Sequence, residues 1–216
     1  MKMISLVDIS VLSILPAALL GLYRWRYAES VYQPFFVLLC IGVLNEALGT
    51  IGAYYFHTNA INSNIYVLIE AILILWQFQK WKLFRHELSY KTVAIILLCV
   101  WVGECFIFSS INFFCSYYRV TYAFAVVLMS ILMVNRLILS EQQSILKNAT
   151  FLICTGFIFY YTYQILVEVF YLYGLNSKEF SNNVYHILSY INIFTNLIYA
   201  IAILWMPRKR EFIQLS

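Results

Sequence analysis

Seven long apolar segments separate the charged residues of this 216-residue chain, and this spacing limits what the chain can fold into. A bilayer core takes roughly 17 to 25 mostly apolar residues per helix. The segments cover residues 7–23, 35–56, 65–79, 93–111, 120–139, 149–173 and 184–206. With 63% hydrophobic and only 11% charged residues, a soluble fold of this size would have too few charges to cover its surface. The sequence therefore predicts an all-α integral membrane protein with seven transmembrane helices, in one domain over residues 1–216.

Lysine and arginine are distributed unevenly between the two sides that these segments define. One side carries eleven of them: Arg24, Arg26, Lys80, Lys82, Arg85, Lys91, Arg136, Lys147, Arg208, Lys209 and Arg210. The other side carries three: Lys2, Arg119 and Lys178. Because cytoplasmic loops are enriched in basic residues, we expect the N-terminus outside and the C-terminus in the cytoplasm. The predicted location is the cell membrane, as a multi-pass protein, with the bacterial inner membrane the simplest choice.

A polar stripe along the last segment has a counterpart in the third. Its members are Tyr185, Ser189, Asn192, Asn196 and Tyr199, which share one helix face. A shift of 119 positions carries Tyr66, Glu70, Leu73 and Gln77 onto Tyr185, Ser189, Asn192 and Asn196, and Asn45 onto Gln164. We infer a 3+1+3 plan of parallel repeats. Repeat 1 covers about 7–81, a linker helix about 91–111, and repeat 2 about 117–206.

Carboxylates inside apolar segments are costly in a bilayer and therefore usually functional. With the expected orientation, Glu46 lies near mid-membrane, whereas Glu70 and Glu168 lie in the outer half. The predicted ligand-binding set is Glu46, Glu70, Tyr160, Gln164, Glu168, Ser189, Asn192 and Asn196. These residues predict an aromatic-lined vestibule that opens outward and suits an organic cation, a small polar ligand or protons. Alternatively, the polar groups hydrogen-bond neighbouring helices and only hold the bundle together.

Arg119, at the outer end of the fifth segment, could neutralise one of these acids. A metal held by His57, His186, Glu70 and Glu168 is conceivable, but no HxxxH, HExxH or ExxH motif occurs, and we predict no metal. The five cysteines, Cys40, Cys99, Cys105, Cys115 and Cys154, have no CxxC spacing and predict buried thiols rather than a disulfide or metal framework.

Several classes of function are excluded or disfavoured. No lysine lies within a segment, which excludes a retinal Schiff base, and no cofactor is predicted. No Ser/His/Asp or Cys/His set shares a plausible depth, so we do not predict an enzyme. The basic residues lie between apolar segments and form no aromatic-interleaved patch, so nucleic acid is not an expected partner.

Short motifs resemble those of a group of small uncharacterised seven-span bacterial membrane proteins. They are residues 64–66 leading to Glu70, residues 78–81, residues 146–148 leading to Gly156 and Tyr160, and residues 193–200 before Trp205. The resemblance implies a sensory or accessory membrane protein that works with separately encoded signalling proteins.

Three interpretations remain open at this point. The first is a receptor-like or accessory membrane module whose ligand repacks the two repeats. Because only eleven residues follow Trp205, we expect its output to pass through a separate cytoplasmic signalling protein. The second is a small-solute or ion transporter or channel. The third is an accessory membrane effector of a bacterial defence system, which acts as a homo-oligomer on the lipid bilayer.

Overall fold

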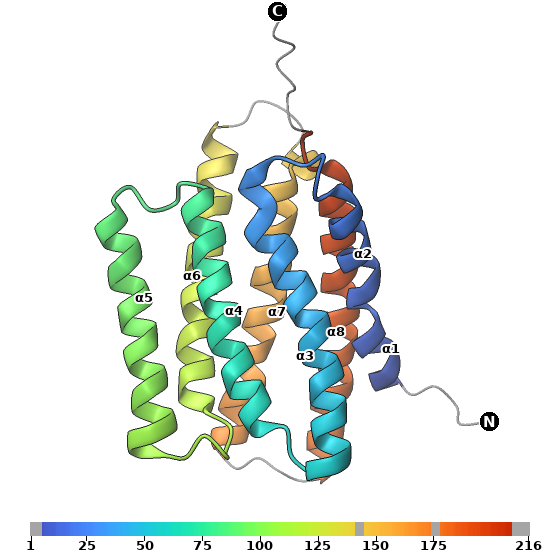
Figure 1. The fold of residues 1–216 in the computed structure, drawn as a ribbon, viewed down its shortest axis with the longest axis vertical. Helices are drawn as coiled ribbons and strands as arrows, with labels where there is room; N and C mark the ends of the chain where they lie inside the picture. The colour runs from blue at the N-terminus through green and yellow to red at the C-terminus, as the bar shows by residue number, and fades with distance from the viewer. Residues whose placement is uncertain (1–5, 141–144, 174–177, 209–216) are drawn as a thin grey trace, which may run out of the picture.

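The structure, a computed structural model, describes residues 6–140, 145–173 and 178–208, and these residues form helices and no β-strand (Figure 1). The helices are α1 (Leu6–Leu12), α2 (Ile14–Arg24), α3 (Gln33–Phe56), α4 (Ala60–Lys80), α5 (Glu87–Val102), α6 (Ser116–Ser140), α7 (Ala149–Leu172) and α8 (Lys178–Trp205). Short turns, η1 (Ser30–Tyr32), η2 (Gly103–Phe108) and η3 (Ile145–Lys147), precede or extend them. Within the described ranges, six helical spans, drawn from α3 to α8, are long and apolar enough to cross a membrane. The all-helical membrane class predicted from the sequence is confirmed.

The first predicted segment differs from the other six because it is a broken helix. Pro16 lacks the N–H that would bond to the carbonyl of Leu12, and its ring crowds that carbonyl. Accordingly α1 ends at Leu12 and α2 begins at Ile14. The hydroxyl of Ser13 donates to the carbonyl of Ser10 over 2.6 Å and satisfies part of the interrupted backbone. The continuous apolar part, Ile9–Arg24, is shorter than the six candidate spans.

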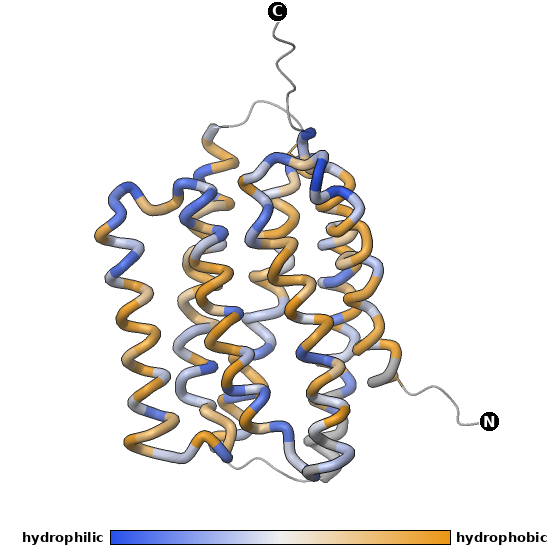
Figure 2. The backbone as a smooth tube through the Cα atoms, viewed as in Figure 1, coloured by the Kyte–Doolittle hydropathy of each residue, from blue (hydrophilic) through white to orange (hydrophobic). Residues whose placement is uncertain are grey.

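The helices close into a ring. Consecutive long helices run in opposite directions, and α2 packs against both α3 and α8, so that the first and last helices meet (Figure 1). The ring continues through α4, α6 and α7, while α5 lies at the edge and contacts α4 and α6. Large hydrophobic side chains such as Ile95, Leu132 and Leu204 are exposed on the outside of this bundle. Figure 2 shows hydrophobic residues along most of the helix lengths and hydrophilic residues gathered in the loops at the top.

The connections that carry most of the basic residues lie at one end of the bundle. Arg136 on α6 donates to the carbonyl of Lys82 after α4, over 2.7 Å. Arg24 at the end of α2 donates to the carbonyls of Ile203 and Leu204 on α8. The ends of α2, α4, α6 and α8 therefore meet on one face, which we call the basic end.

Two buried polar side chains complete helix ends. The Gln77 oxygen accepts from the N–H of Phe35 over 2.9 Å, and its nitrogen donates to the carbonyl of Val31 over 2.8 Å, so that α4 supports the start of α3. The Glu104 carboxylate accepts the backbone N–H groups of Tyr117 and Tyr118 at the start of α6. Both residues are structural supports, as the alternative hypothesis for the intramembrane amides predicts for Gln77.

Several predicted boundaries differ from the structure; for example, α5 begins at Glu87 rather than 93 and α8 at Lys178 rather than 184. The third segment begins at Ala60 rather than 65, because Asn64 is buried inside α4 and its polar groups are bonded across the bundle. The fifth segment continues through Asn135 and Arg136 to Ser140. Arg136 does not interrupt the helix, since its long side chain reaches the carbonyl of Lys82 at the basic end.

Candidate functional site

A cavity of about 160 Å³ lies inside the ring between α3, α4, α7 and α8; we call it the central cavity. Its α4 and α6 residues, such as Ser63 and Arg119, come from the halves of those helices that lie away from the basic end. Six of the eight residues that the sequence predicts as ligand-binding line it: Glu46, Glu70, Tyr160, Gln164, Asn192 and Asn196. The 119-residue shift aligns the polar faces of α4 and α8, and both of these faces line the central cavity.

Glu70 is the most enclosed acidic group of the central cavity, with 7% of its surface exposed. The hydroxyl of Tyr66, one helical turn earlier, donates to Oε1 of Glu70 over 3.0 Å. The phenol of Tyr161 also lies near this carboxyl, and Tyr122 donates to Tyr161 over 2.8 Å. Helices α4, α6 and α7 each contribute to this cluster, in which Tyr66 bonds the carboxyl directly and Tyr122 bonds Tyr161.

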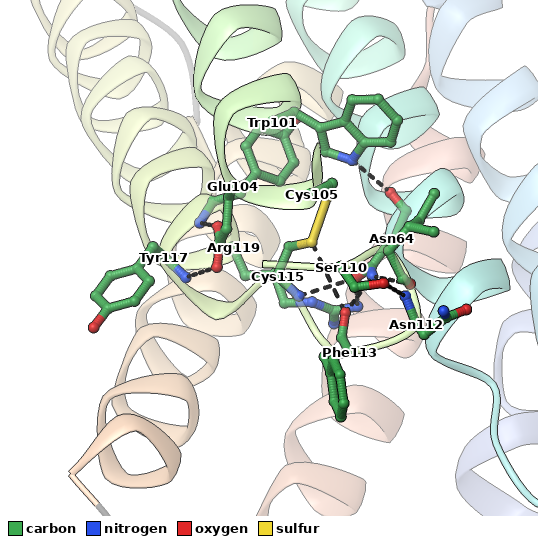
Figure 3. The surroundings of a disulfide bond; sticks show 12 residues. Asn64, Trp101, Glu104, Cys105, Ser110, Asn112, Phe113, Cys115, Tyr117 and Arg119 are labelled. Atoms are coloured by element: carbon green, nitrogen blue, oxygen red, sulfur yellow. Dashed lines mark hydrogen bonds between the residues drawn. A yellow bond between two sulfur atoms is a disulfide. The ribbon is translucent and has the colours of Figure 1, made fainter. Parts of the chain in front are cut away.

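Arg119 is buried at the start of α6 and organises the neighbouring charges (Figure 3). Its Nη2 donates to Oγ of Ser63 over 2.7 Å and to Oδ1 of Asn64 over 3.4 Å. Its Nη1 lies 3.6 Å from Oε1 of Glu168, and the guanidinium lies over the ring of Phe114 at 5.2 Å from the centroid. The expectation that Arg119 neutralises one of the intramembrane acids is confirmed, and the acid is Glu168.

Glu168 does not line the central cavity but a second one of about 230 Å³, which we call the outer cavity. Its walls include the aromatic rings of Phe114 and Tyr171. Arg119, Tyr160 and Gln164 line both cavities. These three side chains therefore stand at the boundary between the two spaces, and the predicted ligand-binding set is divided between them.

Three buried polar atoms at these cavities have no hydrogen-bond partner in the described part of the chain. They are Oε1 of Gln164, Nε of Arg119 and Oγ1 of Thr195. Thr195 is 1% exposed and lines the central cavity. Buried polar groups are nearly always paired, so three unpaired atoms on residues that line these cavities are unusual.

The amides of α8 contact the broken first helix. Asn192 donates to Oγ of Ser10 over 3.1 Å, and Asn196 donates to Oγ of Ser13 over 2.7 Å. Asn196 also donates to Oδ1 of Asn192 over 3.3 Å. These two amides line the central cavity and at the same time hold α1 and α2 in place, so both interpretations of the stripe apply to them.

Ser189 and Glu46 differ from each other in their surroundings. Ser189 is buried but lines neither of the two cavities. Glu46 is half-buried on α3 next to Asn45, whose side chain accepts from Asn62 over 2.9 Å. The side chain of Tyr185 lies outside the described residues.

An aromatic layer closes the central cavity toward the basic end. Phe35, Phe78 and Phe157 are each at most 1% exposed. Phe157 packs against Phe35, Phe78 and Tyr199 with ring centroids 5.8 to 6.4 Å apart. Tyr199 and Phe157 also line the cavity, so they form its floor.

The prediction that the cysteines are all buried thiols was wrong for one pair and for Cys99, whose free thiol is exposed. Cys105 and Cys115 form a disulfide with Cα atoms 6.1 Å apart (Figure 3). Neither belongs to a CxxC motif; the π-helical turn η2 and the following loop bring them together. Asn64 fixes this loop by donating to the carbonyls of Ile111 and Phe113 and accepting from the N–H of Cys115. The loop that carries Phe114 is therefore tied to η2 by the disulfide and to α4 by Asn64.

Among the described residues, no three His, Cys, Asp or Glu side chains are arranged to hold a metal ion. His57 ends α3 in a left-handed conformation with φ 56°, and His186 lies on the exposed surface of α8. The structure thus does not bring the two histidines together with Glu70 and Glu168.

Sequence reasoning missed several lining residues, namely Tyr66, Tyr161 and Thr195, as well as Tyr122 behind them. A usable signal was present for α6, since Tyr122 follows Arg119 at i, i+3 and shares its helix face. Comparison with known proteins adds nothing further: no family model, curated protein or solved structure matches this chain.

Proposed function

We propose that this chain is a receptor-like membrane module that binds a small polar or cationic ligand in the central cavity and passes the binding event to a separate cytoplasmic protein. The observation that carries the proposal is the central cavity itself, which collects Glu46, Glu70 and two unpaired oxygens inside an otherwise apolar bundle. Carboxylates and aromatic faces both favour cations. Such groups are a costly way to fill a membrane protein that needs only packing.

The volume of the cavity limits the ligand. A cavity of roughly 150 Å³ holds a molecule the size of benzene, which has about six heavy atoms. The central cavity, at about 160 Å³, therefore suits a molecule of that size and is too small for drug-sized ligands. Polar groups on several helices would fix its orientation.

Two observations support an orientation with the basic end in the cytoplasm. The basic residues gather at one end, as cytoplasmic loops do. The Cys105–Cys115 disulfide lies at the opposite end, and disulfides persist in oxidising compartments such as the periplasm. In this orientation both cavities face the outside, in the cell membrane of a bacterium.

The aromatic floor offers a route for coupling. A ligand that displaces Tyr199 or Phe157 also moves their contacts with Phe35 and Phe78, which lie under the basic end. Tyr199 belongs to α8, and Arg24 holds the end of that helix against α2. A population shift between two packings of this layer would change the cytoplasmic face.

The 3+1+3 duplication is part of this proposal. It is supported by the position of α5 at the edge of the ring and by the shared role of α4 and α8 in lining the central cavity. A ligand bound between the two halves would be well placed to change how they pack.

One observation favours a transporter as the second candidate. The outer and central cavities share Arg119, Tyr160 and Gln164, so they could be two stages of one path. The aromatic floor argues against transport, because the buried rings of Phe35, Phe78 and Phe157 lie on the side of the central cavity toward the basic end. Solute flux in proteoliposomes separates the two: uptake that saturates with substrate supports transport, and binding without flux supports the receptor.

The direct test is binding of small ammonium ions to the protein in lipid nanodiscs. We expect propylammonium or tetramethylammonium to raise the unfolding temperature of the protein. Glu70→Gln should weaken the binding of these ions about tenfold or more. Glu87→Gln, at an exposed position on α5, is the matched control and should leave binding unchanged. Unchanged binding in both Glu70→Gln and Glu46→Gln would overturn the proposal.

A further inference from the structure

The hydrogen bonds of Arg119 leave its Nε without a partner. A guanidinium has five N–H donors in a fixed fork. Nη2 serves Ser63 and Asn64, and Nη1 lies beside Glu168. Nε is buried and has no partner in the described part of the chain, although Arg119 lines both cavities. Arg119 therefore keeps an unused, charge-assisted donor on a side chain that lines both cavities.

The rest of the central cavity presents acceptors. Glu70 and Glu46 carry carboxylates, and Oε1 of Gln164 is an unpaired amide oxygen. Tyr160 lies at the junction, since its phenol interacts electrostatically with Glu70, Glu46, Arg119 and Glu168. A positive group, Arg119, and two negative groups, Glu46 and Glu70, thus line the same cavity as Tyr160.

A ligand of a single charge fits only part of this arrangement. A simple cation would satisfy Glu70 and Gln164 but would leave Nε of Arg119 unpaired and would be repelled by the guanidinium. A simple anion would bind Arg119 but would be repelled by Glu46 and Glu70. One molecule with both charges satisfies both sides.

We infer that the ligand of the central cavity is a small zwitterion of amino-acid size. Its carboxylate accepts from Nε of Arg119, and its ammonium group lies toward Glu70 and Glu46, with Gln164 Oε1 accepting one of its N–H groups. This inference rests on the proposed function and names the chemical class of its ligand. The volume of about 160 Å³ matches a molecule of about six heavy atoms, such as β-alanine.

Matched ligands test the inference on the unmodified protein. Calorimetry in nanodiscs would compare glycine, β-alanine and 4-aminobutanoate with their primary amides and with propanoate. Each amide keeps the ammonium group and the size of its parent but lacks the negative charge. We expect at least one zwitterion to bind about tenfold or more tightly than its own amide, because the amide loses a charge-assisted bond to Arg119.

The outcomes separate this inference from the proposed function. If the amides bind as tightly as the zwitterions, the inference of a zwitterionic ligand is wrong, whereas the proposed receptor for a cation is still supported. Absence of binding by all seven compounds at millimolar concentration would count against both. Tight binding of propanoate alone would overturn both, since neither a zwitterion nor a cation would then be preferred.

A variant of Arg119 adds a second readout. Arg119→Lys keeps the positive charge beside Glu168 but removes Nε. We expect it to weaken binding of the zwitterion about tenfold or more and to change binding of the amide by no more than about twofold. Arg85→Lys, outside the helices, is the matched control. Equal loss for the zwitterion and the amide would show that Arg119 only maintains the shape of the cavity.

Discussion

Nη1 of Arg119 lies 3.6 Å from Oε1 of Glu168, and this pair stands where the outer and central cavities meet. Both side chains are nearly enclosed, with 10% and 13% of their surface exposed. An ion pair in such surroundings is weakly screened, so losing one partner leaves the other charge poorly compensated. The contact between these two residues therefore couples the stability of the bundle to its candidate site.

Glu168→Gln should destabilise the protein by about 1–3 kcal/mol, because it leaves the buried Arg119 without its charged partner. Thermal unfolding in nanodiscs measures the change. The control is Glu87→Gln, which breaks an exposed pair with Lys91 at 2.9 Å and should cost no more than about 0.5 kcal/mol. Equal effects of the two substitutions would mean that the buried pair contributes no more than a surface pair.

Loss of the Cys105–Cys115 disulfide should lower stability by about 2–4 kcal/mol, since it frees the loop that Asn64 and Phe114 fix beside Arg119. Cys105→Ser with Cys115→Ser should reproduce the effect of a reductant. Cys99→Ser, at an exposed free thiol on α5, is the control and should remain sensitive to the reductant. Maleimide labelling of Cys105 or Cys115 without prior reduction would contradict the bond.

Gln77→Leu should destabilise the bundle by about 2–4 kcal/mol, because it strips partners from two backbone groups, the N–H of Phe35 and the carbonyl of Val31. Gln79→Leu is a control of the same residue type on the same helix. It removes an oxygen that already has no partner in the described part of the chain, so its effect should be within about 0.5 kcal/mol. Similar melting temperatures for the two variants would show that the hydrogen bonds of Gln77 do not stabilise the start of α3.

Gly156→Ala should destabilise the protein by about 1–3 kcal/mol and alter the central cavity, because the new Cβ would lie 2.5 Å from Cε1 of Tyr199. The ring of Tyr199 is packed against Phe35 and cannot yield easily. Gly103→Ala provides the comparison, since its nearest neighbour would be 3.8 Å away in ordinary contact. A crystal or density map of Gly156→Ala with Tyr199 unmoved would refute this account.

Much of the candidate site could be predicted, because polar residues are unfavourable in a bilayer and can be recognised by their residue type within an apolar segment. A carboxylate such as Glu70 or an amide such as Asn192 stands out in an apolar segment, and helical spacing places it on a face. Six of the eight residues selected in this way line the central cavity. Tyr161 was not selected, because tyrosine is also common at membrane interfaces and the sequence contains 18 of them.

The helical membrane class follows from the sequence alone, because apolar segments of about twenty residues have few other stable solutions in lipid. The sequence also determines which faces carry polar groups, since the helix period is fixed. Only the tertiary structure decided which of these groups meet. The packing of α6 against α4 and α7 brings Arg119 to Glu168 and Tyr122 to Tyr161, and the loop after η2 joins Cys105 to Cys115. Contacts between distant segments depend on how whole helices pack, which the local pattern of a single helix does not specify.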